Sequence, residues 1–361
     1  MTSPTRVLLN KNFSVTAAQM TALMGAQAAA GDADAPYELW ASHSDPANGM
    51  LAAASHTLLE PAGLLGDAYA DWLLDACVQR GIGVLWAGKE REWLADHQGR
   101  FAAQGVQLVV PAERHIQEKL DHKDAFLEDW DPQILPIPRW QRFTTPQEFG
   151  AAYAALQGSR RRLCIKPAQG IYASGFRILE DPPSLDGFLG GSLYTMSLAA
   201  ARELFSAPQF PPMLLMEVLE GPERSVDCVA WEGRLIRAVV RRKFGVGQVI
   251  EDRPDLTEAA RRIAERYGLS GIFNFQTKDQ AGAANMLEIN ARASGGLRYS
   301  MAAGVDFLRL GLDAATGRLD WDALPTVQTG FQVYEDKAVR VVPGLPAWAE
   351  AGLHTPSGGR P

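Results

Sequence analysis

The stretch Met286-Leu-Glu-Ile-Asn-Ala-Arg-Ala-Ser-Gly-Gly296 decides the fold that we expect for this chain. Its first half alternates as a half-buried β-strand does, so Leu287 and Ile289 are predicted to face a core. The opposite face carries three polar side chains, Glu288, Asn290 and Arg292. A carboxylate and an amide oxygen suit a hard cation such as Mg²⁺, and an arginine can bind a phosphate or a carboxylate with two hydrogen bonds. The same pattern also fits a solvated strand edge.

The segment 271–278 alternates in the same way, with Phe273 and Phe275 predicted inward and Asn274 and Gln276 outward. Residues 279–283 lie between the two segments and have the composition of a turn. Folding a hairpin about residues 281 and 282 brings Gln276 opposite Glu288. The sequence therefore predicts a metal site with three oxygen ligands, Gln276, Glu288 and Asn290.

The pattern Gln276…Glu288-x-Asn290-x-Arg292-x-Ser-Gly-Gly resembles the magnesium-binding end of ATP-grasp enzymes. It is most similar to the large subunit of carbamoyl-phosphate synthase and to related carboxylate–amine ligases, and the resemblance covers about residues 112–317. Carbamoyl-phosphate synthase carries two copies of the pattern and this chain carries one, which argues against carbamoyl-phosphate synthesis itself.

Two lysines match the family's phosphate-binding positions. Lys123 lies in a segment similar to the family's Asp-Lys-x-x-Phe motif, although His122 departs from it. Lys166 ends a predicted strand, and the loop 168–175 that follows resembles the family's phosphate-covering loop. Backbone N–H groups of such a loop can approach phosphate oxygens while the ammonium neutralises their charge. A lysine beside a turn can also simply be solvated.

The family places the nucleotide base against a bend, which corresponds here to the end of the apolar strand 213–218. The resemblance implies that the backbone of Val218 and Leu219 meets the adenine edge, that Glu217 accepts from adenine or its neighbours, and that Glu223 holds the ribose hydroxyls. Two surface acids flanking a turn are the alternative. Further along, residues 241–247 are expected to form either a substrate-facing anion loop or a mobile strand end.

The first 111 residues alternate between strand and helix patterns, which predicts a parallel sheet covered by helices. The loop after the first strand lacks a Gly-x-Gly-x-x-Gly fingerprint. We expect an α/β protein with an N-terminal pre-ATP-grasp domain (1–111) and a two-lobed α+β ATP-grasp domain (112–320; smaller lobe about 140–218, C-terminal lobe about 219–320). Residues 321–361 would form a peripheral strand and tail. Helices are predicted over 15–30, 66–80, 90–104, 145–156, 254–267 and 297–318.

Composition narrows the function classes. The chain has 361 residues and a net charge of −7, which argues against a broad nucleic-acid-binding surface. Its three cysteines, Cys77, Cys164 and Cys228, lie in apolar contexts and are expected to be buried thiols of a cytoplasmic protein. No apolar run reaches transmembrane length, and the N-terminus turns polar too early for a signal peptide.

These features together predict an ADP-forming ligase that joins a small carboxylate to an amine, or to a thiol, through an acyl-phosphate. ATP and two Mg²⁺ ions, for which Mn²⁺ could substitute, are the expected cofactors. Arg292 and Lys166 are the expected catalytic residues, and a homodimer is a family-based expectation. The rival hypotheses are an ATP-binding sensor or scaffold without turnover, and a small-molecule phosphotransferase.

Overall fold

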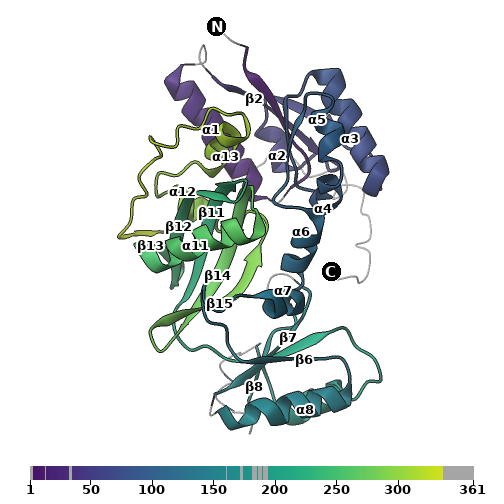
Figure 1. Cartoon of the computed structure of the whole chain (residues 1–361), viewed down its shortest axis with the longest axis vertical. Helices are drawn as coiled ribbons and strands as arrows, with labels where there is room; N and C mark the ends of the chain where they lie inside the picture. Colours follow the sequence, from purple (N-terminus) through teal and green to yellow (C-terminus); the bar gives the residue numbers. More distant parts are fainter. Residues whose placement is uncertain are drawn as a thin grey trace.

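The computed structural model describes residues 3–12, 14–31, 35–159, 161–170, 174–180, 185, 189 and 194–335. Within them the chain forms three sheets, of five, five and six strands (Figure 1). The first sheet and the six-stranded sheet lie side by side, and the second five-stranded sheet projects from one end of the molecule. We call the part built on this second sheet, residues 140–217, the small lobe. The predicted domain boundaries at residues 111 and 320 stay predictions.

The first sheet is parallel, as the alternating pattern predicts, with strand order β3-β2-β1-β4-β5. The order reverses between β1 and β4, and in open α/β sheets ligands bind near such a point. Its strands are β1 (Thr5–Leu9), β2 (Tyr37–His43), β3 (His56–Leu59), β4 (Val84–Trp86) and β5 (Gln107–Val109). Its helices are α1 (Val15–Ala30), α2 (Gly49–Ala52), α3 (Gly66–Arg80), α4 (Arg91–Ala95) and α5 (Gln98–Ala102).

The prediction of α1 and α3 is confirmed to the residue, but the single helix predicted over 90–104 is wrong. Two short helices occupy that segment, separated at Asp96 and His97. His97 leaves the helical region (φ −104°, ψ 5°), and its Nε2 lies 2.9 Å from Asp67 Oδ1. Aspartate and histidine are poor helix formers, so this tertiary hydrogen bond outweighs the local preference for continuing the helix.

The small lobe is an antiparallel sheet with one parallel edge pair, in the order β6-β10-β7-β8-β9. Thr145 caps α8 as predicted, because its hydroxyl accepts from the Glu148 amide at 3.2 Å. Four phenylalanines fill the core between sheet and helices: Phe143, Phe149, Phe205 and Phe210. The elements are β6 (Trp140–Phe143), α8 (Pro146–Leu156), η2 (Gln157–Ser159), β7 (Leu163–Pro167), β8 (Arg177–Leu179), β9 (Thr195–Met196), α10 (Leu198–Leu204) and β10 (Met213–Glu217). Helices α6 (Arg114–Asp121) and α7 (Lys123–Asp129) connect this lobe to the first sheet.

The six-stranded sheet has the order β15-β14-β11-β12-β13-β16, and all of its neighbouring strands are antiparallel. Its strands are β11 (Glu223–Trp231), β12 (Arg234–Phe244), β13 (Gly247–Glu251), β14 (Gly271–Gln280), β15 (Ala283–Asn290) and β16 (Phe331–Val333). Its helices are α11 (Pro254–Tyr267), α12 (Leu297–Met301) and α13 (Phe307–Ala315). A peripheral strand after residue 321 is thus present as β16, while residues 336–361, predicted as a tail, lie outside the described residues.

The helix predicted over 297–318 is also wrong, because the chain breaks between α12 and α13. Gly304 has a φ of 83°, which a right-handed helix cannot accommodate. Two residues later, the Asp306 carboxylate accepts from the Arg309 amide at 2.9 Å and starts the second helix. The prediction of α11 over 254–267 is confirmed.

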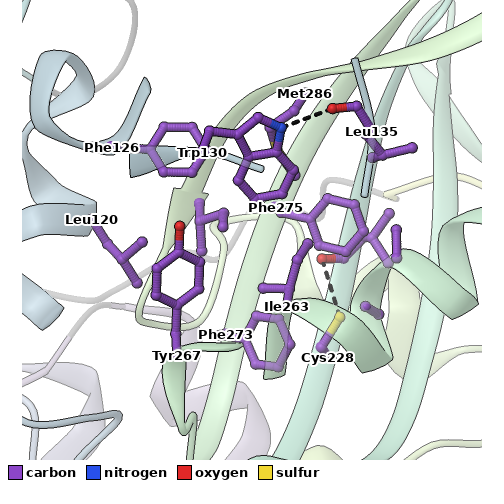
Figure 2. Close-up of a cluster of buried hydrophobic side chains, with 14 of the residues drawn as sticks. Leu120, Phe126, Trp130, Leu135, Cys228, Ile263, Tyr267, Phe273, Phe275 and Met286 are labelled. Carbon is purple, nitrogen blue, oxygen red and sulfur yellow. Dashed lines mark hydrogen bonds between the residues drawn. The ribbon is translucent and has the colours of Figure 1, made fainter. Parts of the chain in front are cut away.

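Two hydrophobic cores support the six-stranded sheet, one on each face. Phe273, Phe275 and Met286 pack against α11 and α7 in the first of them (Figure 2). The other core contains Val229 and Phe307 together with Trp86 of the first sheet. The six-stranded sheet is therefore fixed by apolar packing to the first sheet. The small lobe has the phenylalanine core on one face of its sheet, and Cys164, Leu214 and Met216 on the other face join the first of these two cores.

The pairing of β14 with β15 shifts between Gln276 and Thr277, so one residue of β15 is left over. That residue is Leu287, since Gln276 pairs with Glu288 and Thr277 with Met286. The prediction that Leu287 faces the core is wrong: Met286 is fully buried in its place, and Leu287 lines a cavity. Because this β-bulge inserts one extra residue into β15, Glu288 and Asn290 stay on the cavity face, while the buried apolar position before them moves from Leu287 to Met286.

Candidate functional site

A cavity of about 500 Å³ lies between the small lobe and the six-stranded sheet. Its wall combines backbone and side chains from β7 and β10 on one side with those from β14 and β15 on the other. The structure brings together around this cavity every residue that the sequence predicted for the site: Lys123, Lys166, Glu217, Val218, Leu219, Glu223, Gln276, Glu288, Asn290 and Arg292.

The β14–β15 hairpin places the predicted metal ligands. Its two-residue turn is Ala281-Gly282, with φ angles of 50° and 85°, and Gln280 pairs with Ala283 across it. As a result Gln276 lies directly opposite Glu288. Asn290 Nδ2 donates to Glu288 Oε1 at 3.3 Å. Three side-chain oxygen groups therefore lie on one patch of the cavity wall.

Arg292 follows the hairpin and is held close to the same patch. Its Nη2 donates to Asn290 Oδ1 at 3.0 Å. Arg292 also lines a smaller cavity of about 30 Å³, which reaches the ends of β1 and β4 near Asn12, Gln19 and Arg91. Arg292 thus lines both the large cavity and a smaller one, and the smaller cavity lies at the point where the strand order of the first sheet reverses.

The two lysines lie on the other side of the metal ligands. Lys123 Nζ donates to the Gly170 carbonyl at 2.8 Å and is 3.7 Å from Glu288 Oε2. Burial lowers the pKa of Lys166 from its ordinary value, and the nearby Glu288 carboxylate partly offsets that effect. Lys123 therefore lies within ion-pair distance of the carboxylate, and Lys166 is close enough to interact with its charge. Residues 171–173 of the predicted phosphate-covering loop lie outside the described residues.

The bend after β10 also lines the cavity. The buried Glu217 carboxylate is 3.1 Å from Arg161 Nη1 and 3.6 Å from Arg139 Nη1. The Val218 amide already donates to the Arg162 carbonyl at 2.8 Å, so Val218 can offer only its carbonyl to a ligand. Glu223, at the start of β11, is exposed and lines the cavity.

A buried polar network that sequence reasoning missed lies beneath the metal patch. Asp227 is fully buried, and its carboxylate accepts from Arg241 Nε at 2.8 Å, Ser300 Oγ at 2.6 Å and Asn274 Nδ2 at 2.8 Å. Arg241 also donates to Ser294 Oγ at 2.9 Å, and a Cβ at Gly296 would come within 2.6 Å of its guanidinium. Arg241 therefore binds the protein's own loop, which favours a positioning role over either role that the sequence suggested. Alternation along β11 was the available signal, because it places Asp227 on the polar face.

The donor set fits a hard divalent cation. Among the described residues no group of three or more His, Cys, Asp or Glu side chains is placed to hold a metal. Gln276, Glu288 and Asn290 instead offer one carboxylate and two amides, and oxygen donors are the ligands that Mg²⁺ and Mn²⁺ prefer. Softer metals such as zinc would need thiolates or imidazoles, which this patch of residues does not contain.

Comparisons with known proteins agree with this geometry. A family model described as "ATP-grasp in the biosynthetic pathway with Ter operon" matches residues 209–339, which include the whole six-stranded sheet. The structure of an N5-carboxyaminoimidazole ribonucleotide synthetase in complex with ADP is similar with a TM-score of 0.61 at 15% identity, covering 91% of this chain and 79% of that chain. The chain has the ATP-grasp fold. The predicted resemblance to the ATP-grasp superfamily is thereby confirmed.

Other ATP-grasp structures match over most of this chain. An L-amino acid ligase from Bacillus licheniformis gives a TM-score of 0.56 at 12% identity, covering 90% of this chain and 78% of that one. The biotin carboxylase domain of 2-oxoglutarate carboxylase from Hydrogenobacter thermophilus gives 0.57 at 14% identity, covering 88% and 70%. A search of curated proteins finds no significant match. No helix in the described part of the chain is long and apolar enough to cross a membrane.

Proposed function

We propose that the protein is an ATP-dependent, ADP-forming ligase that joins a small carboxylate to an amine, or to a thiol, through an acyl-phosphate. The observation that carries this proposal is one cavity lined both by three oxygen donors, Gln276, Glu288 and Asn290, and by two cations, Lys123 and Lys166. Such an arrangement suits a nucleoside triphosphate with its divalent ions. The similar structures are those of a synthetase, a biotin carboxylase domain and an L-amino acid ligase, which supports the same class of reaction.

The residues suggest how a nucleotide would lie. The base would rest against the bend after β10, where the Val218 carbonyl and the Leu219 amide would meet its edge and Glu217, oriented by two arginines, would lie beside it. Glu223 would accept from the ribose hydroxyls. Lys123 and Lys166 would neutralise phosphate oxygens, and Gln276, Glu288 and Asn290 would hold Mg²⁺ or Mn²⁺. The bound ions would withdraw charge from the transferred phosphoryl group.

The reaction needs positioning more than covalent chemistry from the protein. A carboxylate oxygen of the acid attacks the γ-phosphorus, and the bond to the β-phosphate oxygen breaks to release ADP. The amine nitrogen then attacks the acyl carbon, loses a proton to solvent, and displaces inorganic phosphate. Arg292 would hold the carboxylate or the acyl-phosphate, and its lining of both the large cavity and the smaller one beside the first sheet supports that role.

The test is a screen of carboxylic acids with and without amines and thiols, in which ADP and phosphate release are followed with Mg²⁺ present. We expect release that needs both an acid and a nucleophile. ADP binding without any release would favour a sensor or scaffold, and a stable phosphate ester formed without a nucleophile would favour a phosphotransferase. Failure to bind ADP with Mg²⁺ would reject the nucleotide site altogether.

A further inference from the structure

Asn274 occupies a position in the site to which the proposed ligase mechanism gives no role. It lies on β14, fully buried, and lines the large cavity. It is directly opposite Asn290 in the strand pairing, just as Gln276 is directly opposite Glu288. Because side chains two residues apart on a strand share a face, these four residues form two cross-strand pairs next to one another.

The orientation of the Asn274 amide is fixed by its nitrogen. Nδ2 lies 2.9 Å from Ser225 Oγ, 2.9 Å from the Val226 carbonyl and 2.8 Å from Asp227 Oδ1, all on β11. A flipped amide would set its oxygen against a carboxylate and a carbonyl, neither of which can donate. Since Nδ2 is turned toward β11, Oδ1 faces away from β11, and β15 with Asn290 flanks β14 on that other side.

This oxygen is a buried acceptor without a hydrogen-bond partner among the described residues. Native proteins pair nearly all of their buried polar atoms, so an unpartnered one beside a cavity indicates a ligand. The local charge also permits a cation, because the neighbouring Arg241 is neutralised by Asp227 at 2.8 Å.

We propose that Asn274 Oδ1 is a further oxygen ligand of the divalent-ion site, paired with Asn290 across the two strands. This rests on the proposed function, since the ion arrives with a nucleotide. An additional amide oxygen would help a site that contains a single carboxylate, Glu288, to fill the coordination sphere of a hard cation. Asp227 is then a positioning residue, which keeps the Asn274 oxygen turned toward the ion.

The experiment measures Mn²⁺ binding in the presence of ADP by calorimetry, on the full chain. Asn274→Ala should weaken Mn²⁺ binding by roughly tenfold or more, as loss of a group that supports a metal site commonly does, while affinity for ADP alone stays as in the wild type. The matched control is Asn285→Ala, because Asn285 is also a largely buried asparagine of the same hairpin but does not line the cavity. Equal Mn²⁺ affinity in Asn274→Ala and wild type would overturn the proposal.

A second measurement decides the matter if Asn274→Ala does not fold. In an Asn290→Asp variant labelled with ¹³Cγ-asparagine, electron spin echo spectra of Mn²⁺ with ADP should still show a strong ¹³C coupling, because Asn274 would remain as an asparagine ligand. Absence of that coupling would overturn the proposal. If the wild type showed no Mn²⁺-dependent ADP binding, the proposed function itself would fail, which is a separate result from unchanged binding in Asn274→Ala.

Discussion

The two sheets that face each other across the cavity supply different kinds of group. The small lobe contributes Lys166 and the backbone of its terminal bend. Its sheet packs against an aromatic core of its own on one face and against the core of the six-stranded sheet on the other. The six-stranded sheet contributes the side-chain oxygens, and its second core joins it to the first sheet as well. Ligands that must keep a fixed geometry around an ion therefore lie on the sheet that packs against both other parts of the molecule. The long lysine side chain, which can adjust its position, comes from the small lobe.

The largest expected effects come from removing one core phenylalanine from each sheet. Phe275→Ala and Phe143→Ala each delete a fully buried ring, which costs about 3–5 kcal/mol of unfolding free energy. Because the core around Phe143 is built from small-lobe residues alone, Phe143→Ala should unfold the small lobe in a distinct, earlier step, whereas Phe275→Ala should destabilise the six-stranded sheet and the parts packed against it. Thermal unfolding followed by calorimetry tests this, and a single transition in Phe143→Ala would break the comparison.

Removing the one carboxylate among the predicted metal ligands should have the next largest effect. Glu288→Gln keeps the size of the side chain, so the fold should stay intact. Mn²⁺-dependent ADP binding should weaken by about 100-fold, at the upper end of the range for groups that support metal sites. Glu265→Gln, on the exposed face of α11, is the matched control. Unchanged binding in Glu288→Gln would contradict a metal site on the six-stranded sheet.

The contribution of the small lobe can be tested by pH. Burial lowers the pKa of Lys166, so its positive charge is lost at lower pH than that of an ordinary lysine. ADP affinity should therefore be full below this lowered pKa and should fall, by roughly tenfold, as the pH rises through it. Lys166→Arg keeps its charge over the same range, and its ADP affinity should not show that fall. A titration of affinity against pH for both proteins checks this, and parallel curves would assign the fall to another group.

The smallest expected effect concerns the cap of α8 in the small lobe. Thr145→Ala removes the hydroxyl that accepts from the Glu148 amide and should cost about 1 kcal/mol. The loss should appear in the unfolding step of the small lobe and leave the remaining transition unchanged. Calorimetry that places the shift in the other transition would show that the two parts do not unfold separately.

Most of the fold could be predicted from local patterns, and the failures have identifiable causes. Helices that end at a glycine in the left-handed region, such as α3 and α11, are observed as predicted. The prediction of a single helix over 90–104 is wrong because a tertiary contact of His97 interrupts it. The prediction that Leu287 faces the core is wrong because a bulge inserts one residue, and an alternating pattern does not reveal a bulge by itself.

The candidate site was predictable where adjacent residues carry the pattern and not where distant strands meet. Pairing of Gln276 with Glu288 follows from a short hairpin, so its geometry could be worked out. The network around Asp227 joins β11, β12, β14 and α12, and those contacts depend on sheet order that no local pattern specifies. Whether the Val218 amide can bind a ligand is likewise decided by a distant part of the chain, since this amide already donates to the Arg162 carbonyl.

Trp86 has a consequence for any attempt to recombine this chain with its structural relatives. Its ring lies so close to the backbone of α13 and β14 that a Cβ would come within 2.5 Å at Gly311 and 3.3 Å at Gly271. Both positions must stay glycine as long as the tryptophan is present. Chimeras that graft a foreign N-terminal portion must therefore carry this tryptophan with them, or redesign the two glycines, so the first sheet cannot be exchanged as an independent module.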